Sequence, residues 1–411
     1  MRAGKKCYSA IISLVFPCLF FPLLIIAFPL PSHSIELINT DLLSCDLSGN
    51  VRGNYLGIHD NHLGKDHDSG LMLLRMILTG DIAEKSWFEF HLLQGGMINP
   101  LPEAAAGFVA FSGADRFRVD SLVHTQTTRE DFSSFMAIDR ANISLRFSRF
   151  DITAGRQAIS LGTTYFWNPI DLLTNFSPYE FDRDYKPGVD AVMTDMALGE
   201  FSGISLIYAA GRDFDFDKSA LLLRPFTNVF NFDLSMTTGW YRRDGFVGAD
   251  FSGEVGPGIG LRGELAYFAT EEDTDFVQVV VGSEYRFTNN FYLSGEYFYN
   301  GYGTPHTSRY LSKILSDRIL EGDLYNISRH YLGVLGSYEI TPLLTVSLAT
   351  IVNLIDGSML IDPTVIYSLS DNTELVAGMV IGVGEEPRLP ELKSEFGTYP
   401  IYTFVQVKYY F

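Results

Sequence analysis

The sequence predicts an all-β protein, a transmembrane up-and-down antiparallel β-barrel of about 18 strands, with 16 as the alternative count. Three observations support this fold: an alternating apolar and polar C-terminal segment, a cleavable leader, and strand-like segments of about ten residues that recur between turn signals. After residue 34, no apolar run reaches the length of a membrane helix. A chain that crosses a bilayer without helices must close into a barrel, because only closure satisfies every backbone group in hydrocarbon.

The first 34 residues have the organisation of a secretory signal peptide. A basic start is followed by an almost wholly apolar run at residues 10–28, and Ser32 and Ser34 place small residues where signal peptidase reads them. We therefore predict a signal peptide over residues 1–34, cleaved after Ser34. A retained membrane helix is the alternative, which three prolines disfavour. A lipoprotein is less favoured, because acids interrupt the apolar stretch before Cys45.

The mature chain is predicted to have one domain. Residues 35–49 form a short periplasmic N-terminal segment, and residues 50–411 form the transmembrane barrel with long external loops. The segment 35–49 looks too short to plug a barrel, which argues against a TonB-dependent transporter. Removing the leader takes away three cations and no acids, so the formal charge changes from −19 to −22. Such an acidic chain is not expected to bind nucleic acid.

Cysteine and histidine patterns indicate neither a cofactor nor a metal site. Two of the three cysteines leave with the leader, and Cys45 alone cannot close an intrachain disulfide. The chain has no CxxCH for a c-type haem and no CxxC pair or HExxH helix for zinc. We expect no cofactor, no metal and no catalytic residue.

The strand-like segments give an even count, which leaves both termini of a bacterial barrel in the periplasm. They lie near 51–59, 70–79, 86–94, 135–147, 150–157, 188–197, 203–211, 219–226, 231–241, 246–254, 259–269, 275–287, 291–300, 329–338, 344–352, 361–369, 373–382 and 401–411. If the last strand runs back to the periplasm, the short joins fall on that side. The long connections 95–134, 158–187, 301–328 and 383–400 then fall outside, as is usual in outer-membrane barrels.

Charged residues on these strands are expected to face the lumen, because a charge facing lipid near the midplane costs several kcal/mol. The lumen candidates are Arg140, Arg146, Arg262, Glu264, Glu284, Arg286 and Glu296. The three glutamates form an acidic arc across from Arg140 and Arg146, which predicts a water-filled pore with a weak cation preference. The alternative is a mutually salt-bridged lumen without selectivity.

The third external connection is the candidate constriction. It is long, aromatic and dense in charge, and the residues proposed to narrow the pore are Trp167, Asp171, Asp182, Arg183, Asp184 and Lys186. The alternative is an external cap packed by Phe166, Trp167 and Tyr179.

The last strand has apolar residues at every second position and polar Gln406 and Lys408 between them. Its end, with Tyr409 and a final Phe411, resembles the C-terminal signature of Gram-negative outer-membrane barrels. The resemblance implies that the barrel-assembly machinery reads these residues. A soluble sandwich strand that ends on Phe is the alternative.

Several stretches resemble porin-like outer-membrane proteins related to the alginate-export barrels. They are DITAGRQAIS, WNPIDLL, DRDYKPGVDA, ISRHYLG, ITPLLTVSLATIVNLIDGS and SEFGTYP. The resemblance covers most of the mature chain and implies a barrel for passive transport. It does not imply alginate, because the sugar-binding arginines of that family cannot be placed here one by one. Porins are often homo-oligomers, but the evenly apolar outward faces single out no interface.

The predicted function is a porin-like channel in the bacterial outer membrane, in contact with lipid, for passive diffusion of small solutes or ions. A barrel that holds a partner protein, such as a multihaem cytochrome, is the second hypothesis. An outer-membrane hydrolase is the third; it would need Ser, His and an orienting polar group together on the lipid face. His330 lies near the expected outer rim, but no inferred set of such residues converges there.

Overall fold

The computed structural model describes residues 34–59, 65–83, 85–100, 114–178, 180, 182–271, 273–388 and 391–411. The predicted signal peptide, apart from Ser34, and Tyr179 lie outside the described residues, so the leader stays a prediction.

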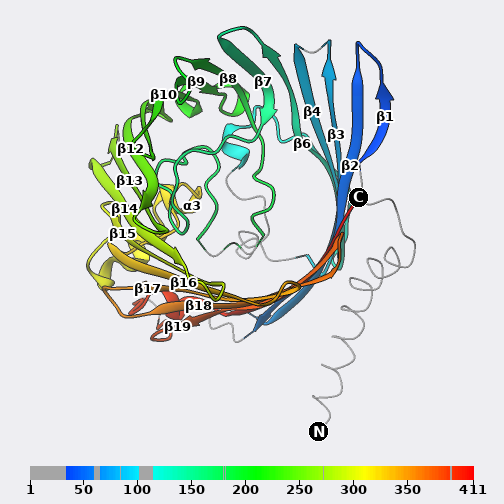
Figure 1. The fold of residues 1–411 in the computed structure, drawn as a ribbon. Helices are drawn as coiled ribbons and strands as arrows, with labels where there is room; N and C mark the ends of the chain where they lie inside the picture. Colours follow the sequence, from blue (N-terminus) through cyan, green and yellow to red (C-terminus); the bar gives the residue numbers. More distant parts are fainter. Residues whose placement is uncertain are drawn as a thin grey trace.

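The protein is a closed antiparallel barrel of 18 strands, as predicted (Figure 1). The barrel strands are β2 (Ser44–His59), β3 (His67–Ile82), β4 (Ser86–Ile98), β6 (Phe132–Arg146), β7 (Phe150–Gln157), β8 (Val189–Ala197), β9 (Ser202–Ala209), β10 (Ala220–Val229), β11 (Phe232–Tyr241), β12 (Asp244–Val255), β13 (Ile259–Ala269), β14 (Phe276–Arg286), β15 (Phe291–Asn300), β16 (His330–Thr341), β17 (Leu344–Asn353), β18 (Met359–Ser370), β19 (Thr373–Val383) and β20 (Ile401–Tyr410). Pairing of β20 with β2 closes the barrel, from Asn50↔Tyr410 to His59↔Ile401.

Two further strands extend the wall. Strand β1 (Ile35–Asn39) pairs with the first residues of β2, beyond the last residue of β20, and β5 (Val123–Thr128) pairs with the part of β6 that β7 does not reach. The expected boundary at residue 50 therefore falls inside a strand. Strand β2 begins at Ser44 because β3 still supplies backbone partners there, as in Asp46↔Thr79.

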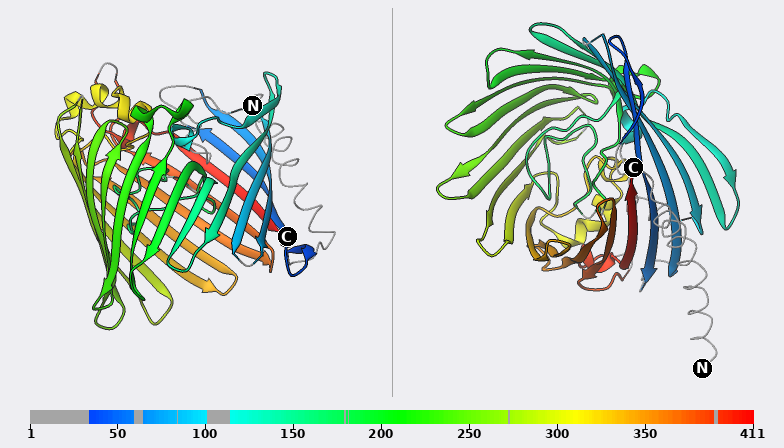
Figure 2. Two further views of the ribbon diagram at one scale, coloured as in Figure 1. Left: turned by 90° about the horizontal axis from the view of Figure 1, so that it is seen from above. Right: turned by 45° about the vertical axis from the view of Figure 1, so that its right-hand side comes forward.

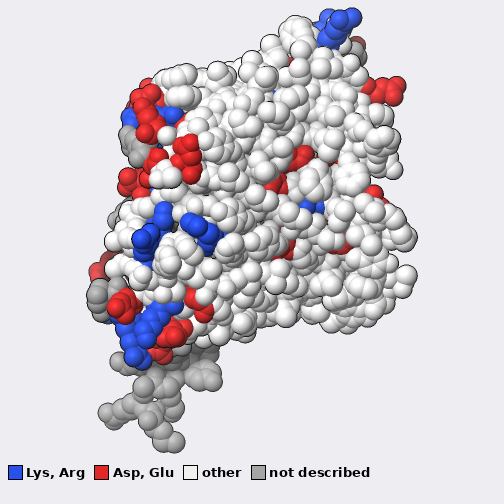
Figure 3. Space-filling view, turned by 90° about the vertical axis from the view of Figure 1, so that its left-hand side faces the viewer, with Lys and Arg blue, Asp and Glu red and all other residues white. Residues whose placement is uncertain are grey.

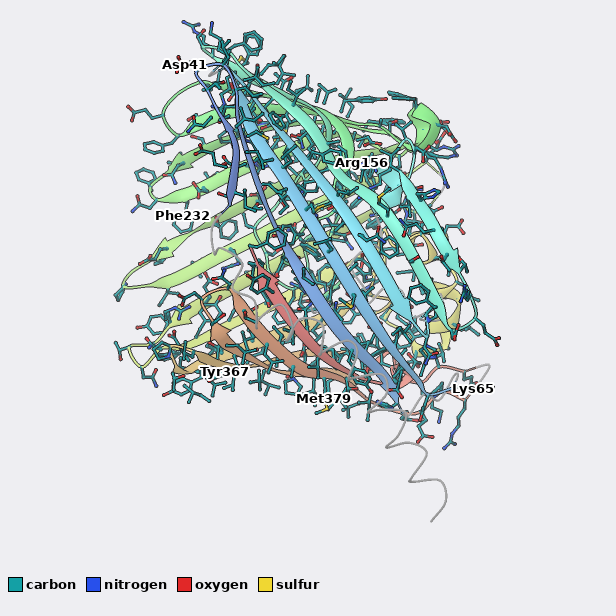
Figure 4. The ribbon with its side chains drawn as sticks, turned by 90° about the vertical axis from the view of Figure 1, so that its right-hand side faces the viewer. Asp41, Lys65, Arg156, Phe232, Tyr367 and Met379 are labelled. Atoms are coloured by element: carbon teal, nitrogen blue, oxygen red, sulfur yellow. The ribbon has the colours of Figure 1, made fainter. Side chains whose placement is uncertain are left out.

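The two ends of the barrel differ, as the loop lengths predict. We call the end with the short turns and Phe411 the turn end, and the opposite end the loop end (Figure 2). The labels Asp41 and Lys65 in Figure 4 mark these two ends beside the tilted strands β2 and β3. Short helices occupy the loop-end connections: η2 (Ala114–Phe117), η3 (Arg212–Phe214), η4 (Phe216–Lys218), η5 (Thr307–Arg309), α2 (Tyr310–Ile314), α3 (Asp317–Leu320) and η6 (Phe396–Thr398). None of the helices that the structure describes is long and apolar enough to cross a membrane.

The outward face of the wall is apolar. On β13 to β15, Leu265, Val281 and Leu293 are exposed on the outside, while Glu264 and Glu296 on the same strands are buried on the inside. This alternation is the period of two that a barrel strand requires. Figure 3 views the side that carries β12 to β15 and shows a broad surface with few charges, which gather mainly at one edge.

The inside of the barrel is not polar throughout. Near the loop end, inward-facing side chains such as Phe268 and Phe298 are buried in two apolar clusters. They face inward because their partners are residues of the connection between β7 and β8, such as Ile170 and Trp167, and not water. Side chains of the wall and of this connection therefore fill much of the lumen at that end.

Candidate functional site

The connection between β7 and β8, residues 158–188, runs inside the barrel, and we call it the lumen loop (Figure 1). We call the part that follows β7 the first limb and the part that leads into β8 the second limb. A buried ion pair between Asp171 on the first limb and Lys186 on the second joins them. Arg183 gathers the rest of the loop by donating hydrogen bonds to the backbone carbonyls of Tyr165, Ser177, Pro178 and Glu180. The loop is therefore a compact element, although it lacks helices and strands among its described residues.

Two buried carboxylates on one wall hold the first limb of the loop. Glu264 on β13 accepts hydrogen bonds from the amides of Thr163 (2.6 Å), Thr164 (2.9 Å) and Ile170 (3.2 Å), and from the Thr164 hydroxyl (2.7 Å). Glu296 on β15 accepts from the next two amides, those of Tyr165 (2.6 Å) and Phe166 (2.8 Å).

Aromatic packing adds to this attachment. The Trp167 ring stacks on Phe298 at 5.2 Å and lies 5.9 Å from Tyr331. Its Nε1 donates to Asn326 Oδ1 at 2.9 Å, so the outer connection 301–329 contacts the lumen loop from the loop end. Trp167 is buried and does not line water.

The opposite wall holds the second limb through charge. Asp182 pairs with Arg52 on β2 and accepts a hydrogen bond from Gln406 Nε2 on β20 at 2.8 Å. Asp184 pairs with Lys408 at 2.8 Å and with Arg52 at 3.2 Å. Burial opposes ionisation of Asp182, but the charges of Arg52 and Lys408 hold its pKa below the usual value. The carboxylates of the second limb thus attach it to a basic wall.

A β-bulge extends this basic wall to β6. The pairing of β4 with β6 shifts register between His91 and Leu92, so that Asp139 and Arg140 both bond to the end of the lumen loop. Asp139 also pairs with Arg75 at 2.6 Å and Arg118 at 2.9 Å. Arg140 pairs with Glu89 at 3.0 Å and so does not face the acidic arc as an unpaired charge.

The ring of Tyr185 completes the contact between the loop and the basic wall. The guanidinium groups of Arg52 and Arg75 lie 4.9 and 4.3 Å from its centroid, within the range of cation–π attraction. Arg52, Arg75 and Asp139 are not among the residues predicted from the sequence. The period of two along 51–59 would have placed Arg52 inward, but the bulge that exposes Asp139 leaves no such pattern.

The predicted constriction residues therefore divide into two groups. Trp167, Asp171, Asp182 and Lys186 are buried and hold the loop together or to the wall. Arg183 and Asp184 keep partly exposed side chains and are the two that reach lumen space.

The predicted lumen charges are also mostly paired. Glu264 and Glu296 bind the loop, and Glu284 pairs with Arg262 and the Tyr292 hydroxyl. Arg286 lies over the Tyr292 ring at 5.5 Å. Arg146 is half-exposed and lies 3.7 Å from Asp81, so it does not stand across from the acidic arc.

A cavity of about 720 Å³ opens between the lumen loop and the turn end, along β7 to β12. Thr163 of the lumen loop borders it. Its charged lining residues are Arg149, Asp151, Asp195, Glu200, Arg224, Asp233 and Asp250. Acids outnumber bases in this lining, so the cavity is electronegative.

No protein-family model matches the chain, and no curated protein sequence matches it. Among solved structures, Acinetobacter baumannii OccAB4 superposes with a TM-score of 0.58 at 10% identity, over 93% of this chain and 100% of that chain. Pseudomonas aeruginosa OccK11 (OpdR) gives 0.57 at 12% identity, over 89% and 95%. P. aeruginosa OccK5 (OpdH) gives 0.57 at 9% identity, over 89% and 97%. The chain is therefore similar in fold to these barrels, as a closed antiparallel barrel of 18 strands.

Proposed function

We propose that this chain is an outer-membrane channel of the porin type, through which small polar solutes or ions diffuse passively. The observation that carries this proposal is a loop that lies inside a closed barrel, tied to both walls, beside an electronegative cavity at the turn end. In the proposed orientation the turn end faces the periplasm, the long connections face outward, and the apolar outer wall contacts lipid.

The proposed path is narrow. A solute leaves the cavity of about 720 Å³ and passes the lumen loop, where Arg183 and Asp184 meet lumen space. The apolar clusters at the loop end exclude much of the remaining cross-section. Bore, loop fold and lumen charge determine such transport, and no catalytic group is required.

The alternative of a sheath around a partner protein is less well supported. A sheath needs a lumen that a second chain can enter, whereas here the protein's own loop crosses the barrel and packs against β13, β15, β2 and β20.

Single-channel recording in planar bilayers tests the proposed function. Wild-type protein should give discrete conductance steps, and removal of residues 164–185 should raise the step size several-fold, because the cross-section widens. A variant that lacks residues 213–217, an outer segment on another connection, serves as the control and should keep the wild-type step. Folded, inserted wild-type protein that gives no steps would rule out a channel.

A further inference from the structure

We propose that Glu264 and Glu296 are positioning residues, which fix the lumen loop at one depth and so determine the width of the pore and not its charge selectivity. The inference deepens the proposed channel function and rests on it. It also separates these two glutamates from Glu284, with which they share the inward face of neighbouring strands.

The chemistry of the contact supports a positioning role. Residues 163–166 present four successive amides to the wall, and Ile170 adds a fifth. Inside a barrel packed with apolar side chains, an amide without a partner is costly. A carboxylate can accept several hydrogen bonds at once, and a charged acceptor forms stronger bonds than a carbonyl. The two glutamates therefore supply partners that the loop backbone lacks.

Burial argues against a role in selectivity. Glu264 is 3% exposed and Glu296 is 1% exposed, so neither presents a carboxylate to lumen water. The amide dipoles that point at them offset their charge. Glu284 is more exposed and pairs with Arg262, which in turn donates a hydrogen bond to the Thr163 carbonyl of the loop at 3.1 Å, so its carboxylate is not a partner of the loop amides. An ion in the lumen therefore meets little field from Glu264 or Glu296.

The two attachments of the loop have opposite polarity, which fixes its direction across the barrel. The first limb offers N–H donors to an acidic wall at β13 and β15, and the second offers carboxylates to a basic wall at β2 and β20. Sliding or reversal would place carboxylates against carboxylates. The loop is thus held to the barrel wall by electrostatic attraction at both ends.

Gly162 shows how closely the loop approaches Glu264. Its φ is +79°, and a Cβ there would lie 2.5 Å from Glu264 Oε1 and 2.1 Å from Asn168 Oδ1. Neither distance is tolerated without movement. Gly162→Ala therefore forces the Glu264 carboxylate, the Asn168 side chain or the loop backbone to move, and it disturbs this contact without changing any charge.

Four variants test the proposal: Glu264→Gln, Glu296→Gln, Gly162→Ala and, as the matched control, Glu284→Gln. Glutamine keeps the shape of glutamate but is neutral and carries an NH2 donor in place of one acceptor oxygen. We expect the first three variants to change single-channel conductance by about twofold or more and to add current noise, with an unchanged reversal potential in a salt gradient. Glu284→Gln should keep the wild-type conductance. Equal shifts of reversal potential in all three glutamine variants, at constant conductance, would overturn the proposal.

Hydrogen exchange gives a readout that does not depend on conduction. The amides of Thr163, Thr164 and Ile170 should exchange about tenfold faster or more in Glu264→Gln, because bonds to a charged acceptor are lost. Glu284→Gln should leave them protected. Unchanged protection in Glu264→Gln refutes the positioning role. If the exchange rates change as expected but the protein does not conduct, only the channel function is refuted. If Glu264→Gln does not fold, Thr164→Val removes one donor and should give the same effects to a smaller degree.

Discussion

At the scale of single residues, Arg52 illustrates how the lumen charges stabilise the fold. It pairs with Asp182 and Asp184, and its side chain and that of Asp182 are only 7% and 11% exposed. Removing one member of a buried pair leaves the other charge without compensation, which costs more than the pair itself contributes.

We therefore predict that Arg52→Ala lowers the free energy of unfolding by about 3–5 kcal/mol. Arg146→Ala is the control, because Arg146 is half-exposed and 3.7 Å from Asp81, and it should cost at most about 1 kcal/mol. Urea unfolding in lipid, followed by tryptophan fluorescence, measures both. A loss below 1 kcal/mol for Arg52→Ala would show that Gln406 and Lys408 are sufficient for Asp182.

Arg156, the arginine of the GRQ stretch, also has a structural role. Its position in the wall is labelled in Figure 4. It pairs with both oxygens of Asp190, at 2.8 and 2.9 Å, and donates to the carbonyls of Ser121 and Ile138 at 3.0 Å. These bonds join the short strands β7 and β8 to the segment before β5. The stretch DITAGRQAIS thus contains an arginine that adds side-chain bonds to the backbone pairing of β6, β7 and β8.

At the scale of elements, the strands and the end of the barrel on which each long connection lies followed from the sequence, but the partners of the lumen loop did not. Every predicted barrel segment overlaps a strand, because the alternation of a membrane barrel extends over about ten residues each time. Strands β1 and β5 were missed, since both are short and largely exposed. The partners of the lumen loop could not be predicted, because Glu264 and a pore-lining glutamate have the same pattern in sequence. What distinguishes them is a contact about one hundred residues away.

The seam between β20 and β2 gives a second prediction. Phe411 donates its N–H to Gly49 O at 3.0 Å and accepts from Gly49 N at 2.9 Å, so it extends the closing ladder by one pair. Deleting Phe411 should lower the folded, membrane-inserted fraction without preventing secretion. The shift in apparent mass between unboiled and boiled samples measures that fraction. Phe411→Tyr keeps the ring and both backbone bonds and should behave as wild type; equal insertion of the deletion variant would contradict a role for this residue.

At the scale of the whole molecule, the structure indicates that charge selectivity arises in the cavity at the turn end and not at the acidic arc of Glu264, Glu284 and Glu296. The acidic arc is occupied by the lumen loop and Arg262, whereas the cavity at the turn end has an acidic lining. Asp195 and Asp233 lie in that lining with neutral hydrogen-bond partners, Ser205 and Asn228. A cavity whose lining carries an excess of one sign of charge raises the local concentration of counter-ions.

We therefore expect a cation preference that depends on Asp195 and Asp233. The double variant Asp195→Asn, Asp233→Asn should shift the reversal potential toward anions in dilute salt. The shift should disappear near 1 M salt, where the screening length is about 3 Å. Glu284→Gln serves as the comparison and should shift it less. A larger shift for Glu284→Gln than for the double variant would show that the acidic arc determines the selectivity.

The position of the lumen loop in the chain has a consequence for the order of assembly. The loop lies between residues 157 and 189, but it bonds to Glu264 and Glu296 further along and to Gln406 and Lys408 at the end of the chain. Contacts so distant in sequence form late, because a long loop must close before they contribute. The strand that closes the barrel also supplies Gln406 and Lys408, which bond to Asp182 and Asp184 of the loop. The attachment of the loop to the basic wall is therefore complete only when the seam closes, and a barrel that is still open at its seam holds the second limb less firmly.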